Sequence, residues 1–482
     1  MLNTLNYHFS SIIDGTPLEK DGHKDLEVFN PYNNEVIGKI SCATPEDVKA
    51  AVESAHRAYE DTMKGMPAHK RSEILRKTAD LLEGRSDEFA QVLALEAGKP
   101  IKEARGEVLR AVQVLRFASE GAKAIYGETI PLDSAIGGEN QIGIAKRVPL
   151  GVVAAITPFN FPLNLVLHKV APALAVGNTI VLKPAEKTPF TPVLLHQLFE
   201  EAGLPKGALN IVMGPGKELV EPLVIHPKVK KVTFTGSGAV GWKIHDMAKR
   251  KKVTLELGSN APNIIFEDAD LELAANSIVL GGFTYAGQAC VSAQRIYVHE
   301  SVYQPFLDKL VAKVSALKTG DPLEESTDMG PMITEEAAER AESWIQEAKQ
   351  QGATVLTGGE RKGSMLQPTV VADATAEMKV VCVEVFAPIV SVMPFSTEEE
   401  VVAHANDTDF GLHAGVFTAD INRAMRMADA IDTGGVWINE VSVRRYDHIP
   451  YGGVKSSGIG KEGVKYSIES MTDLKFIGIK LY

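Results

Sequence analysis

The sequence predicts an α/β protein with a doubly wound parallel sheet, a second α/β unit and a small β element. Between residues 152 and 249, short runs rich in Val, Ile and Thr alternate with helix-like segments. Such alternation is typical of a parallel sheet whose two faces are covered by helices. Amphipathic helices and apolar strands continue after residue 257 and predict the second unit. Extended segments within 126–148 and at 473–480 stand outside the alternation and predict the β element.

Length and composition restrict the class of protein. A chain of 482 residues is too long for one hydrophobic core, so two or three structural parts are expected. The net charge of −12 argues against a broad surface for nucleic acid or for an anionic membrane. The three cysteines are too few and too scattered for a disulfide framework, and no cysteine or histidine spacing predicts a metal site. With no signal-peptide pattern and no apolar run of membrane-spanning length, a cytoplasmic protein is expected.

The chain begins with short extended segments and then becomes helical. Residues 5–40 alternate apolar runs with turn signals, which predicts β-hairpins. Thr44 has the character of a helix N-cap, because a proline follows it and acidic residues fill the first turn. Helical patterning continues to about residue 124, and breaks near 64–67 and 98–100 predict several consecutive helices.

The two α/β regions supply the remaining elements. Extended segments at 126–132 and 141–148 predict a hairpin before the first sheet. That sheet region is expected to run as strand 152–156, helix 163–175, strand 179–183, helix 191–202, strand 209–213, helix 218–225, strand 231–235 and helix 240–249. The second unit is expected to contain helix 271–286, strand 294–298, helices 302–317 and 335–351, and strands 380–383 and 389–393.

A glycine-rich turn at 236–241 has the pattern of a dinucleotide fingerprint. It follows a predicted strand and opens a predicted helix, so its glycines would let the backbone approach a pyrophosphate at the helix N-terminus. A tight turn explains the same pattern about equally well. The acidic ribose ligand of such folds lies about 20 residues further on, where this chain has Glu256. Glu256 could therefore be the ribose ligand or a catalytic base, and residues 183–186 offer a second ribose site.

Cys290 is the candidate nucleophile. It ends the segment 287–290, between a predicted helix and a predicted strand, where the backbone can expose a side chain. Only the thiolate attacks, and an unperturbed cysteine is mostly thiol at neutral pH. Such a residue needs a base, a group that binds an oxyanion and an acceptor for the leaving group. Cys42 and Cys382 are expected to be inert packing residues.

Six motifs occur in order along the chain, at 157–162, 183–186, 255–258, 287–290, 384–388 and 450–458. Together they resemble the aldehyde dehydrogenase superfamily over essentially the whole chain, most of all its branch for lactaldehyde and succinate semialdehyde. Phe159, Ser259 and Ala387 stand where tryptophan, glycine and glycine are commoner in that family. The resemblance implies a Rossmann-like cofactor domain, an α/β catalytic domain and a small β oligomerisation element.

The resemblance implies oxidation of an aldehyde to its carboxylate with a nicotinamide dinucleotide. Cys290 would attack the aldehyde carbon as a thiolate, and the Asn160 amide with the Cys290 backbone N–H would stabilise the oxyanion. Glu256 would activate the water that hydrolyses the resulting thioester. By residue type alone, Asn160 could instead be a turn residue, which is the less favoured interpretation.

Three other functions stay open at this point. An acylating relative passes the thioester to coenzyme A, although such enzymes usually lack the carboxylate that Glu256 supplies. A glyceraldehyde-3-phosphate or semialdehyde dehydrogenase that prefers NADP is the second, and Ala289 argues against the phosphate enzyme, which tends to carry arginine there. A non-catalytic protein that keeps the fold is the third, although every chemical position is filled.

The resemblance also implies a cofactor site. The residues that it assigns to the dinucleotide are Ile156, Thr157, Phe159, Lys183, Ala185, Glu186, Gly216, Phe234, Gly236, Ser237, Val240, Leu257, Glu384 and Phe386. A carboxylate at Glu186 that accepts both ribose hydroxyls would repel a 2′-phosphate, which predicts NAD over NADP, with NADP as the alternative. Glu384 could instead be a surface charge at a strand edge.

The substrate is predicted from fewer residues. Arg445 precedes the last motif, where relatives border the substrate entrance, and arginine suits a carboxylate, phosphate or sulfonate. We therefore expect a small polar or anionic aldehyde, bound by Arg445 and Phe161. The alternative is that Arg444 and Arg445 pair with Asp447 or with a neighbouring subunit.

The expected domains combine these arguments. Residues 1–125 and 149–256 form the dinucleotide-binding domain, 257–450 the catalytic domain, and 126–148 with 451–482 the oligomerisation element. By resemblance, the protein is expected to be a homodimer or a homotetramer.

Overall fold

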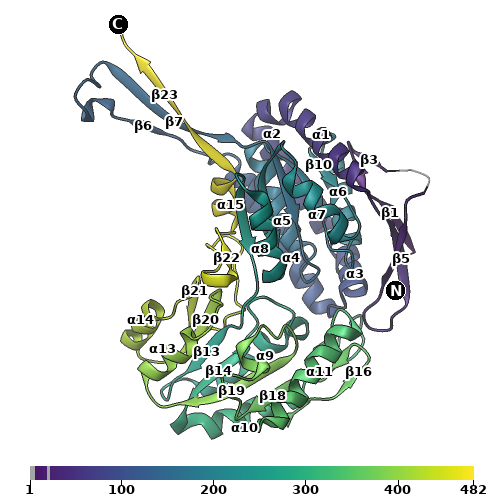
Figure 1. Cartoon of the computed structure of the whole chain (residues 1–482), viewed down its shortest axis with the longest axis vertical. Helices are drawn as coiled ribbons and strands as arrows, with labels where there is room; N and C mark the ends of the chain where they lie inside the picture. The colour runs from purple at the N-terminus through teal and green to yellow at the C-terminus, as the bar shows by residue number, and fades with distance from the viewer. Residues whose placement is uncertain (1–5, 19–21) are drawn as a thin grey trace.

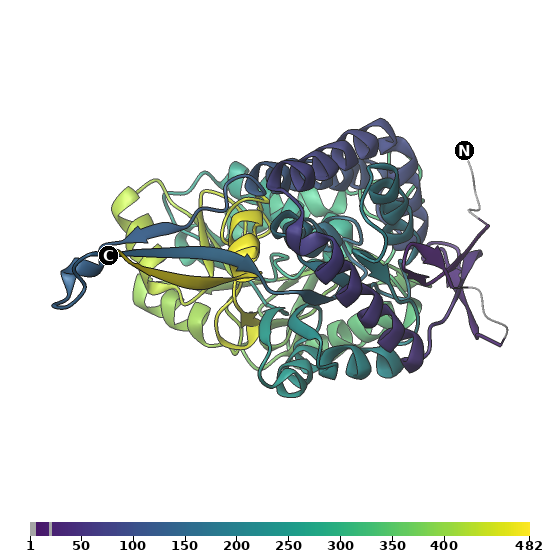
Figure 2. The ribbon, with the colours of Figure 1, turned by 90° about the horizontal axis from the view of Figure 1, so that it is seen from above.

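The computed structural model of the chain describes residues 6–18 and 22–482. Two α/β units lie one above the other, and a narrow β arm extends from the upper unit (Figure 1). Seen from above, the arm leaves the body on the side opposite the N-terminal strands (Figure 2). Two α/β sheets and a separate three-stranded β sheet are the architecture that the sequence predicts.

The upper unit is built on an eight-stranded sheet in the order β22-β12-β11-β8-β9-β10-β2-β3. Its five central strands are parallel; they are β8 (Val152–Ile156), β9 (Thr179–Lys183), β10 (Leu209–Ile211), β11 (Val229–Thr235) and β12 (Lys252–Glu256). Chain order reverses between β8 and β11, and ligands of doubly wound sheets bind outside the strand ends at such a reversal. The prediction of a doubly wound sheet is confirmed.

Helices cover both faces of this sheet. The crossover helices are α5 (Asn164–Val176), α6 (Phe190–Glu201), α7 (Gly216–Ile225) and α8 (Gly238–Ala248). The N-terminal helices are α1 (Pro45–Asp61), α2 (Ala68–Gly84), α3 (Ser86–Ala97) and α4 (Ile101–Gly121). Thr44 caps α1 as predicted, because its hydroxyl accepts from the Asp47 backbone and the Asp47 carboxylate accepts in return. The break at Arg85 was not predicted, although Gly84 ends α2 directly before it.

Short strands complete the edges of the upper unit. A separate sheet in the order β1-β5-β4 contains β1 (Tyr7–Ser10), β4 (Asp25–Phe29) and β5 (Val36–Ser41). The predicted hairpins are present as β4–β5 and as β2 (Ile12–Ile13) with β3 (Thr16–Pro17), whereas β1 pairs with β5 in parallel.

The lower unit is a seven-stranded sheet in the order β15-β18-β19-β14-β13-β20-β21. Its strands are β13 (Pro262–Ile265), β14 (Arg295–His299), β15 (Thr354–Thr357), β18 (Thr369–Ala372), β19 (Ile389–Phe395), β20 (His413–Phe417) and β21 (Gly435–Ile438), with the small hairpin β16 (Arg361–Lys362) and β17 (Met365–Leu366). Its helices are α9 (Leu271–Phe283), α10 (Tyr303–Ser315), α11 (Glu335–Gln350), α12 (Lys379–Cys382), α13 (Glu398–Asn406) and α14 (Ile421–Ala430).

The strand predicted at 380–383 is wrong, because residues 380–382 belong to the one-turn helix α12 and Val383 follows its end. Val380 and Val381 are both buried, as they also would be in a strand covered on both faces. A run of four apolar residues is too short for its periodicity to separate the two structures.

The arm is an antiparallel sheet in the order β23-β7-β6, formed by β6 (Glu128–Ile130), β7 (Gln141–Pro149) and β23 (Thr472–Lys480). The terminal strand β23 pairs along its whole length with β7 of its own chain. The predicted boundary at 451 requires a correction. Strand β22 (Gly458–Ile459) pairs with β12, and α15 (Val464–Ser470) packs on α5, so the chain re-enters the upper unit before it reaches the arm.

Candidate active site

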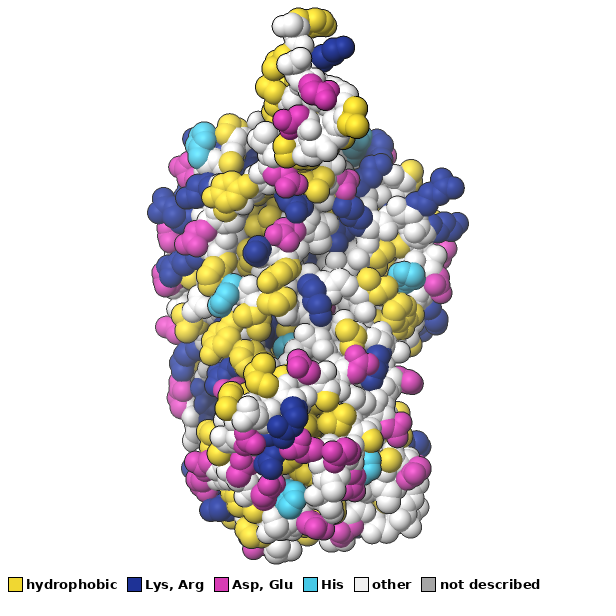
Figure 3. Space-filling model, turned by 90° about the vertical axis from the view of Figure 1, so that its left-hand side faces the viewer, with side chains coloured by type: hydrophobic (Ala, Val, Ile, Leu, Met, Phe, Trp, Pro, Cys, Tyr) yellow, Lys and Arg dark blue, Asp and Glu magenta, His cyan; other side chains and the backbone are white. Residues whose placement is uncertain are grey.

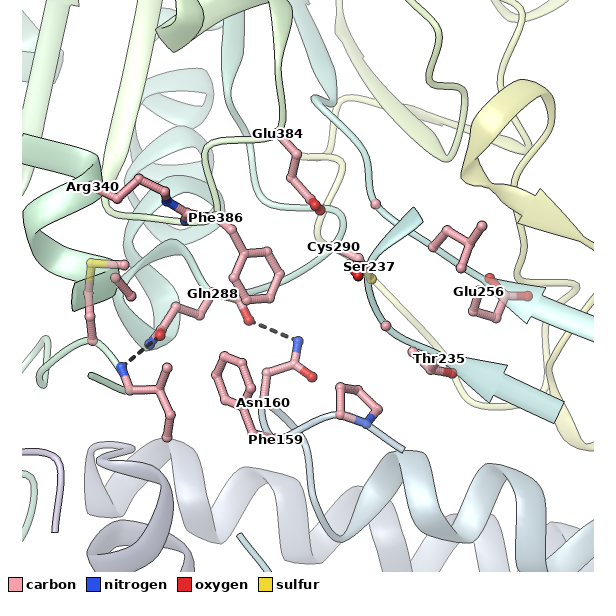
Figure 4. A pocket seen from close by; sticks show the side chains of 17 residues that line it. Phe159, Asn160, Thr235, Ser237, Glu256, Gln288, Cys290, Arg340, Glu384 and Phe386 are labelled. Carbon is pink, nitrogen blue, oxygen red and sulfur yellow. Dashed lines mark hydrogen bonds between the residues drawn. The ribbon is translucent and has the colours of Figure 1, made fainter. Parts of the chain in front are cut away.

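A cavity of about 350 Å³ lies between the two units, at the carboxyl ends of the central strands of the upper sheet. The loop after β8, the turn between β11 and α8, the end of β12 and loops of the lower unit all reach it. Figure 4 shows Cys290, Glu256, Asn160, Ser237 and Glu384 around this space. The cavity therefore lies where the strand order of the upper sheet reverses.

The backbone before Cys290 is held in an unusual conformation. Helix α9 ends at Phe283, three residues earlier than predicted, and Tyr285, Ala286 and Gly287 all have positive φ. The Tyr285 backbone N–H donates to Glu103 Oε2 at 3.0 Å, and its hydroxyl donates to the Ala97 carbonyl at 2.6 Å.

Gly287 has a separate steric reason to be glycine, because a Cβ there would lie 2.1 Å from the Ala387 carbonyl oxygen. Left-handed backbone at non-glycine residues costs of order 1–3 kcal/mol each and persists only where surrounding contacts impose it. Contacts from the helical N-terminal region and from the lower unit thus place Cys290 at the cavity.

The Cys290 sulfur faces Tyr451. The distance between Sγ and the Tyr451 hydroxyl is 2.8 Å. Burial raises the pKa of the Cys290 thiol to about 11, while the Tyr451 hydrogen bond and the Arg445 charge act in the opposite direction. The resting sulfur is therefore mostly a thiol near neutral pH, and reaction requires groups that stabilise its thiolate.

Glu256 lies at the end of β12 with its carboxyl group buried and unpaired. Neither oxygen has a hydrogen-bond partner within the described residues, and the side chain faces the cavity (Figure 4). Burial first and the charge of Glu462 second raise its pKa well above that of an ordinary glutamate. An unpaired carboxyl group beside a cavity can accept a hydrogen bond from a water molecule that enters.

Asn160 presents its side-chain amide to the same space. Its Nδ2 donates to the Gln288 carbonyl at 2.9 Å, as the dashed line in Figure 4 shows. A primary amide carries two N–H groups, so the second one is available to another acceptor. Gln288 is itself held, because its Oε1 accepts from the Ile333 backbone N–H at 2.9 Å.

A buried lysine supports the Asn160 loop from behind. Lys99 Nζ donates to the Asn160 carbonyl at 2.9 Å and pairs with the Glu107 carboxylate. The other Glu107 oxygen accepts the backbone N–H of Leu163 at 3.0 Å, at the start of α5. Lys99 also lies 3.8 Å from the centroid of the Phe161 ring. Phe161, predicted to contact substrate, therefore packs behind the Asn160 loop and does not line the cavity.

Glu186 and Lys183 form a second polar group, at the end of β9. Glu186 Oε1 lies 3.1 Å from Lys183 Nζ and accepts the Gly216 backbone N–H at 2.6 Å. Lys183 and Glu186, predicted to hold the adenosine ribose, are thus neighbours, and Gly216, predicted to contact the cofactor, lies beside them. Ser237 lies on the cavity wall just before α8, so the start of a helix faces the same space.

Glu384 and Phe386 reach the cavity from the lower unit. Glu384 Oε1 accepts the Ser259 backbone N–H at 3.1 Å, and burial raises the pKa of its carboxyl group to about 7. A Cβ on Gly258 would lie 2.4 Å from Glu384 Oε2, so glycine permits this approach. Phe386 faces Phe159 edge-on at 6.1 Å between ring centroids. A buried carboxyl group beside open space can accept hydrogen bonds from the hydroxyl groups of a ribose.

A comparison with known protein families decides the identity. The profile of the aldehyde dehydrogenase family matches residues 18–477. The chain belongs to the aldehyde dehydrogenase family.

This aldehyde dehydrogenase has curated relatives of nearly its own length. The 3-sulfolactaldehyde dehydrogenase of Priestia aryabhattai is 48% identical over 456 residues, which cover 95% of each chain. The lactaldehyde dehydrogenase of Methanocaldococcus jannaschii is 41% identical over 470 residues, which cover 96% of this chain and 99% of the relative. The protein is therefore an oxidoreductase that acts on aldehydes.

Solved structures share the whole fold of this aldehyde dehydrogenase. Aldehyde dehydrogenase 21 from Physcomitrella patens, in complex with the reaction product succinate, has a TM-score of 0.95, 41% identity and 98% coverage of both chains. A glyceraldehyde-3-phosphate dehydrogenase from Methanocaldococcus jannaschii, complexed with NADP, has a TM-score of 0.92, 40% identity, and coverage of 96% of this chain and 100% of that one. The NAD⁺ complex of a Bacillus cereus aldehyde dehydrogenase has a TM-score of 0.95, 38% identity, and coverage of 99% and 98%.

The structure brings the three predicted catalytic residues of this aldehyde dehydrogenase to one cavity, together with six of the predicted cofactor residues. The predicted residues that line it are Phe159, Asn160, Gly236, Ser237, Glu256, Leu257, Cys290, Glu384 and Phe386. The other predicted cofactor residues are not among those that line this cavity and lie at strand ends, in turns and in the first turns of helices: Ile156, Thr157, Lys183, Ala185, Glu186, Gly216, Phe234 and Val240.

Several lining residues were not predicted. Gln288 stands inside the nucleophile motif and could have been found there, whereas Ala337 and Arg340 come from α11, which carries no motif. Thr235 ends β11 directly before the glycine-rich turn. No group of three metal-ligating side chains occurs in residues 6–18 and 22–482.

Arg445, predicted to bind substrate, lies behind Tyr451 and is not among the residues that line the cavity. Its guanidinium group lies 3.8 Å from the centroid of the Tyr451 ring and pairs with Glu462 at 3.3 Å. The alternative prediction, that Arg444 and Arg445 pair with Asp447, also differs from the structure, because Arg444 pairs with Glu440 at 2.7 Å. Asp447 accepts instead from Arg110, Asn164 and His168.

Proposed function

We propose that this aldehyde dehydrogenase oxidises a small polar or anionic aldehyde to its carboxylate with NAD, through a thioester on Cys290. One observation carries the proposal. A nucleophile, an amide with a free N–H and an unpaired carboxyl group (Cys290, Asn160 and Glu256) line a single cavity. These are the three groups that acyl chemistry on a cysteine requires.

The steps follow from the chemistry of these groups. The Cys290 thiolate adds to the aldehyde carbon and forms a thiohemiacetal, whose oxyanion accepts from the free N–H of Asn160 and from the Cys290 backbone N–H. The dinucleotide, when bound, supplies the acceptor for the hydride that leaves this carbon. The product on Cys290 is a thioester. Glu256 takes a proton from a water molecule, the water oxygen attacks the thioester, and the carbon–sulfur bond breaks to release the carboxylate and the thiolate.

Polar side chains at the cavity and beside it support the binding of a dinucleotide. Lys183 and Glu186 would hold the adenosine ribose, and Glu384 the other ribose, while Ser237 would contact the pyrophosphate at the start of α8. Solved relatives are complexed with NADP or with NAD⁺. We favour NAD here because the Glu186 carboxylate would face a 2′-phosphate with like charge.

Replacing Glu186 by serine tests the cofactor proposal. The ratio of kcat/KM with NADP to kcat/KM with NAD is expected to rise about tenfold or more, because a like-charge contact costs several kcal/mol. Glu218→Ser, an exposed charge removal in the first turn of α7, is the matched control and should leave the ratio unchanged. An unchanged ratio in Glu186→Ser would refute the role of Glu186.

The chemical class of the substrate is supported by the relatives. Their names specify 3-sulfolactaldehyde and lactaldehyde, and one solved relative holds succinate. These molecules are short, and each is hydroxylated or anionic. Arg445 Nε is buried without a hydrogen-bond partner in the described part of the chain, so the guanidinium group keeps a donor for an anion.

Arg445→Met tests this substrate assignment. The ratio of kcat/KM for an anionic aldehyde, such as succinate semialdehyde, to kcat/KM for a neutral aldehyde of equal length is expected to fall about 10- to 100-fold, the size of one hydrogen bond to a charged group. The ratio cancels any effect on the sulfur itself. Equal losses for both aldehydes would show that Arg445 does not recognise the anion.

A direct assay tests the reaction. Purified protein mixed with NAD and a panel of short aldehydes should produce NADH, and thiol alkylation should abolish the signal. The panel includes glyceraldehyde 3-phosphate with NADP, because one solved relative carries that name and that cofactor. Coenzyme A is added in a separate arm, and an acyl-coenzyme A product in place of the free acid would identify the acylating alternative.

We further propose that the protein is a homodimer or homotetramer assembled in part through the arm, in a reducing, cytoplasmic setting. Leu474, Phe476 and Ile479 of β23 are 59%, 55% and 43% exposed. Figure 3 shows an apolar band on the face below the arm. Apolar surface of this kind marks an association site. No helix among the described residues is both long and apolar enough to cross a membrane.

A further inference from the structure

Tyr451 is fixed against the reactive sulfur by packing. Its side chain is buried, and its ring meets His413 edge-on with 4.9 Å between centroids. It forms a small apolar cluster with Val291 and Leu412, against which Cys290 packs. The ring therefore has one orientation, in which its hydroxyl oxygen lies 2.8 Å from Cys290 Sγ.

A buried ion pair with Glu462 holds the Arg445 cation over the face of the Tyr451 ring. The Arg445 guanidinium group lies 3.8 Å from the ring centroid, and Glu462 holds it at 3.3 Å. Glu462 also pairs with Lys169, whose Nζ donates to the Thr235 hydroxyl at 2.7 Å. A cation over an aromatic face that is away from water is a favourable contact. Arg445 is thus held in place by the Tyr451 ring and by the Glu462 carboxylate.

Only one direction of hydrogen bonding suits this contact once the sulfur ionises. A thiolate carries no hydrogen and can only accept. Burial raises the pKa of the Tyr451 hydroxyl well above its ordinary value, so that group is protonated near neutral pH. The hydroxyl therefore donates to the sulfur.

We propose that Tyr451 is a catalytic residue that donates a hydrogen bond to the Cys290 thiolate, and that Arg445 is a positioning residue that acts through Tyr451. The inference rests on the proposed function and deepens it. No proton moves in this contact, because the tyrosine keeps its O–H bond while the sulfur charge is stabilised. Asn160 serves the oxyanion, so the two donors act on different atoms.

The charged and titratable groups around the sulfur make this donor necessary. Tyr451 and Arg445 favour the thiolate, whereas Glu256 and Glu384 oppose it, together with burial. The hydrogen bond from Tyr451 is the one that the sulfur has within the described residues. Without it, the balance shifts toward the thiol.

The test is the pH dependence of thiol alkylation, which needs neither aldehyde nor dinucleotide. Iodoacetamide reacts with Cys290 in a Cys382→Ala background, because Cys382 is the exposed thiol, and peptide mass spectrometry identifies the modified residue. In Tyr451→Phe the midpoint of the rate profile is expected to move up by about one to two pH units, which is the size of a hydrogen bond to a charged group. A profile that overlays the parent would overturn the proposal.

Further variants protect the test from effects on folding. Tyr303→Phe removes a half-buried hydroxyl that donates to the Val392 carbonyl on the lower sheet, and its midpoint should stay at the parent value. 3-Fluorotyrosine at position 451 keeps the shape and strengthens the donor, so the midpoint should move down. An upward shift or no shift there would contradict the donor role even if Tyr451→Phe does not fold.

Arg445 is tested in the same assay. Arg445→Met should raise the midpoint by less than Tyr451→Phe does, and Arg445→Lys should restore part of the shift. An unchanged midpoint in Arg445→Met would remove Arg445 from the proposal. If alkylation behaves as expected while no aldehyde yields NADH, the proposed function fails and the sulfur contact stands, so the two failures are distinguishable.

Discussion

Replacement of Cys290 by alanine is expected to lower the rate of aldehyde oxidation by on the order of 10⁴- to 10⁶-fold, as removal of a catalytic nucleophile does in other covalent enzymes. The expectation follows from the cavity, where Cys290 is the one cysteine among the lining residues and the carboxyl and amide groups cannot form a thioester. NADH production at saturating aldehyde measures the effect.

Two controls make the Cys290 result specific. Cys382→Ala removes the exposed thiol outside the cavity and should leave the rate unchanged. NAD binding, followed by quenching of protein fluorescence, should persist in Cys290→Ala, because the side chains proposed to hold the dinucleotide remain. Aldehyde oxidation by Cys290→Ala at more than about one per cent of the parent rate would refute covalent catalysis by this sulfur.

Replacement of Glu256 by glutamine is expected to separate the two halves of the reaction. The amide keeps the shape of the side chain but cannot take a proton from water, so hydrolysis should slow about 10²- to 10⁴-fold. Hydride transfer does not need this group. A stopped-flow trace should therefore show a burst of NADH of about one per active site, followed by a slow steady rate. Loss of the burst itself would place Glu256 in the first step.

The Glu256 carboxyl group also predicts a pH dependence. Because its pKa is raised well above the ordinary value by burial, the group is protonated at low pH and gains its basic form only as pH rises through that raised pKa. The hydrolysis rate should therefore increase with pH, with a midpoint clearly above that of a solvent-exposed glutamate. Single-turnover hydrolysis of the thioester measures it, and Glu360→Gln, an exposed carboxylate, serves as the control.

The chemistry of the site could be predicted where a short segment carries it. Cys290 with its preceding glycine, Glu256 at a strand end and the glycine-rich turn at 236–241 each lie within a few consecutive residues. Local rules for strand ends and turns therefore apply to them. The doubly wound sheet was predictable for the same reason, because each strand and each helix leaves a periodic pattern in its own segment.

The wrong predictions for the end of α9 and for the segment 380–383 share one physical cause. Helix α9 ends at Phe283 because Glu103 and Ala97, far away in the chain, hold Tyr285 in a left-handed conformation. Residues 380–382 form a helical turn whose Val380 and Val381 pack in the core of the lower unit. In each case tertiary contacts outweigh a weak local preference.

By itself, the sequence determined which groups we propose for the chemistry: a sulfur, an amide and a carboxyl group, each inside a recognisable segment. The tertiary structure alone decided how those atoms are held and activated. The Tyr451 hydroxyl meets Cys290 across 161 residues, Lys99 meets the Asn160 carbonyl across 61, and Arg445 turns to Glu462 behind the ring. Such contacts follow from side-chain packing between distant segments, and this packing leaves no period or spacing in a single chain.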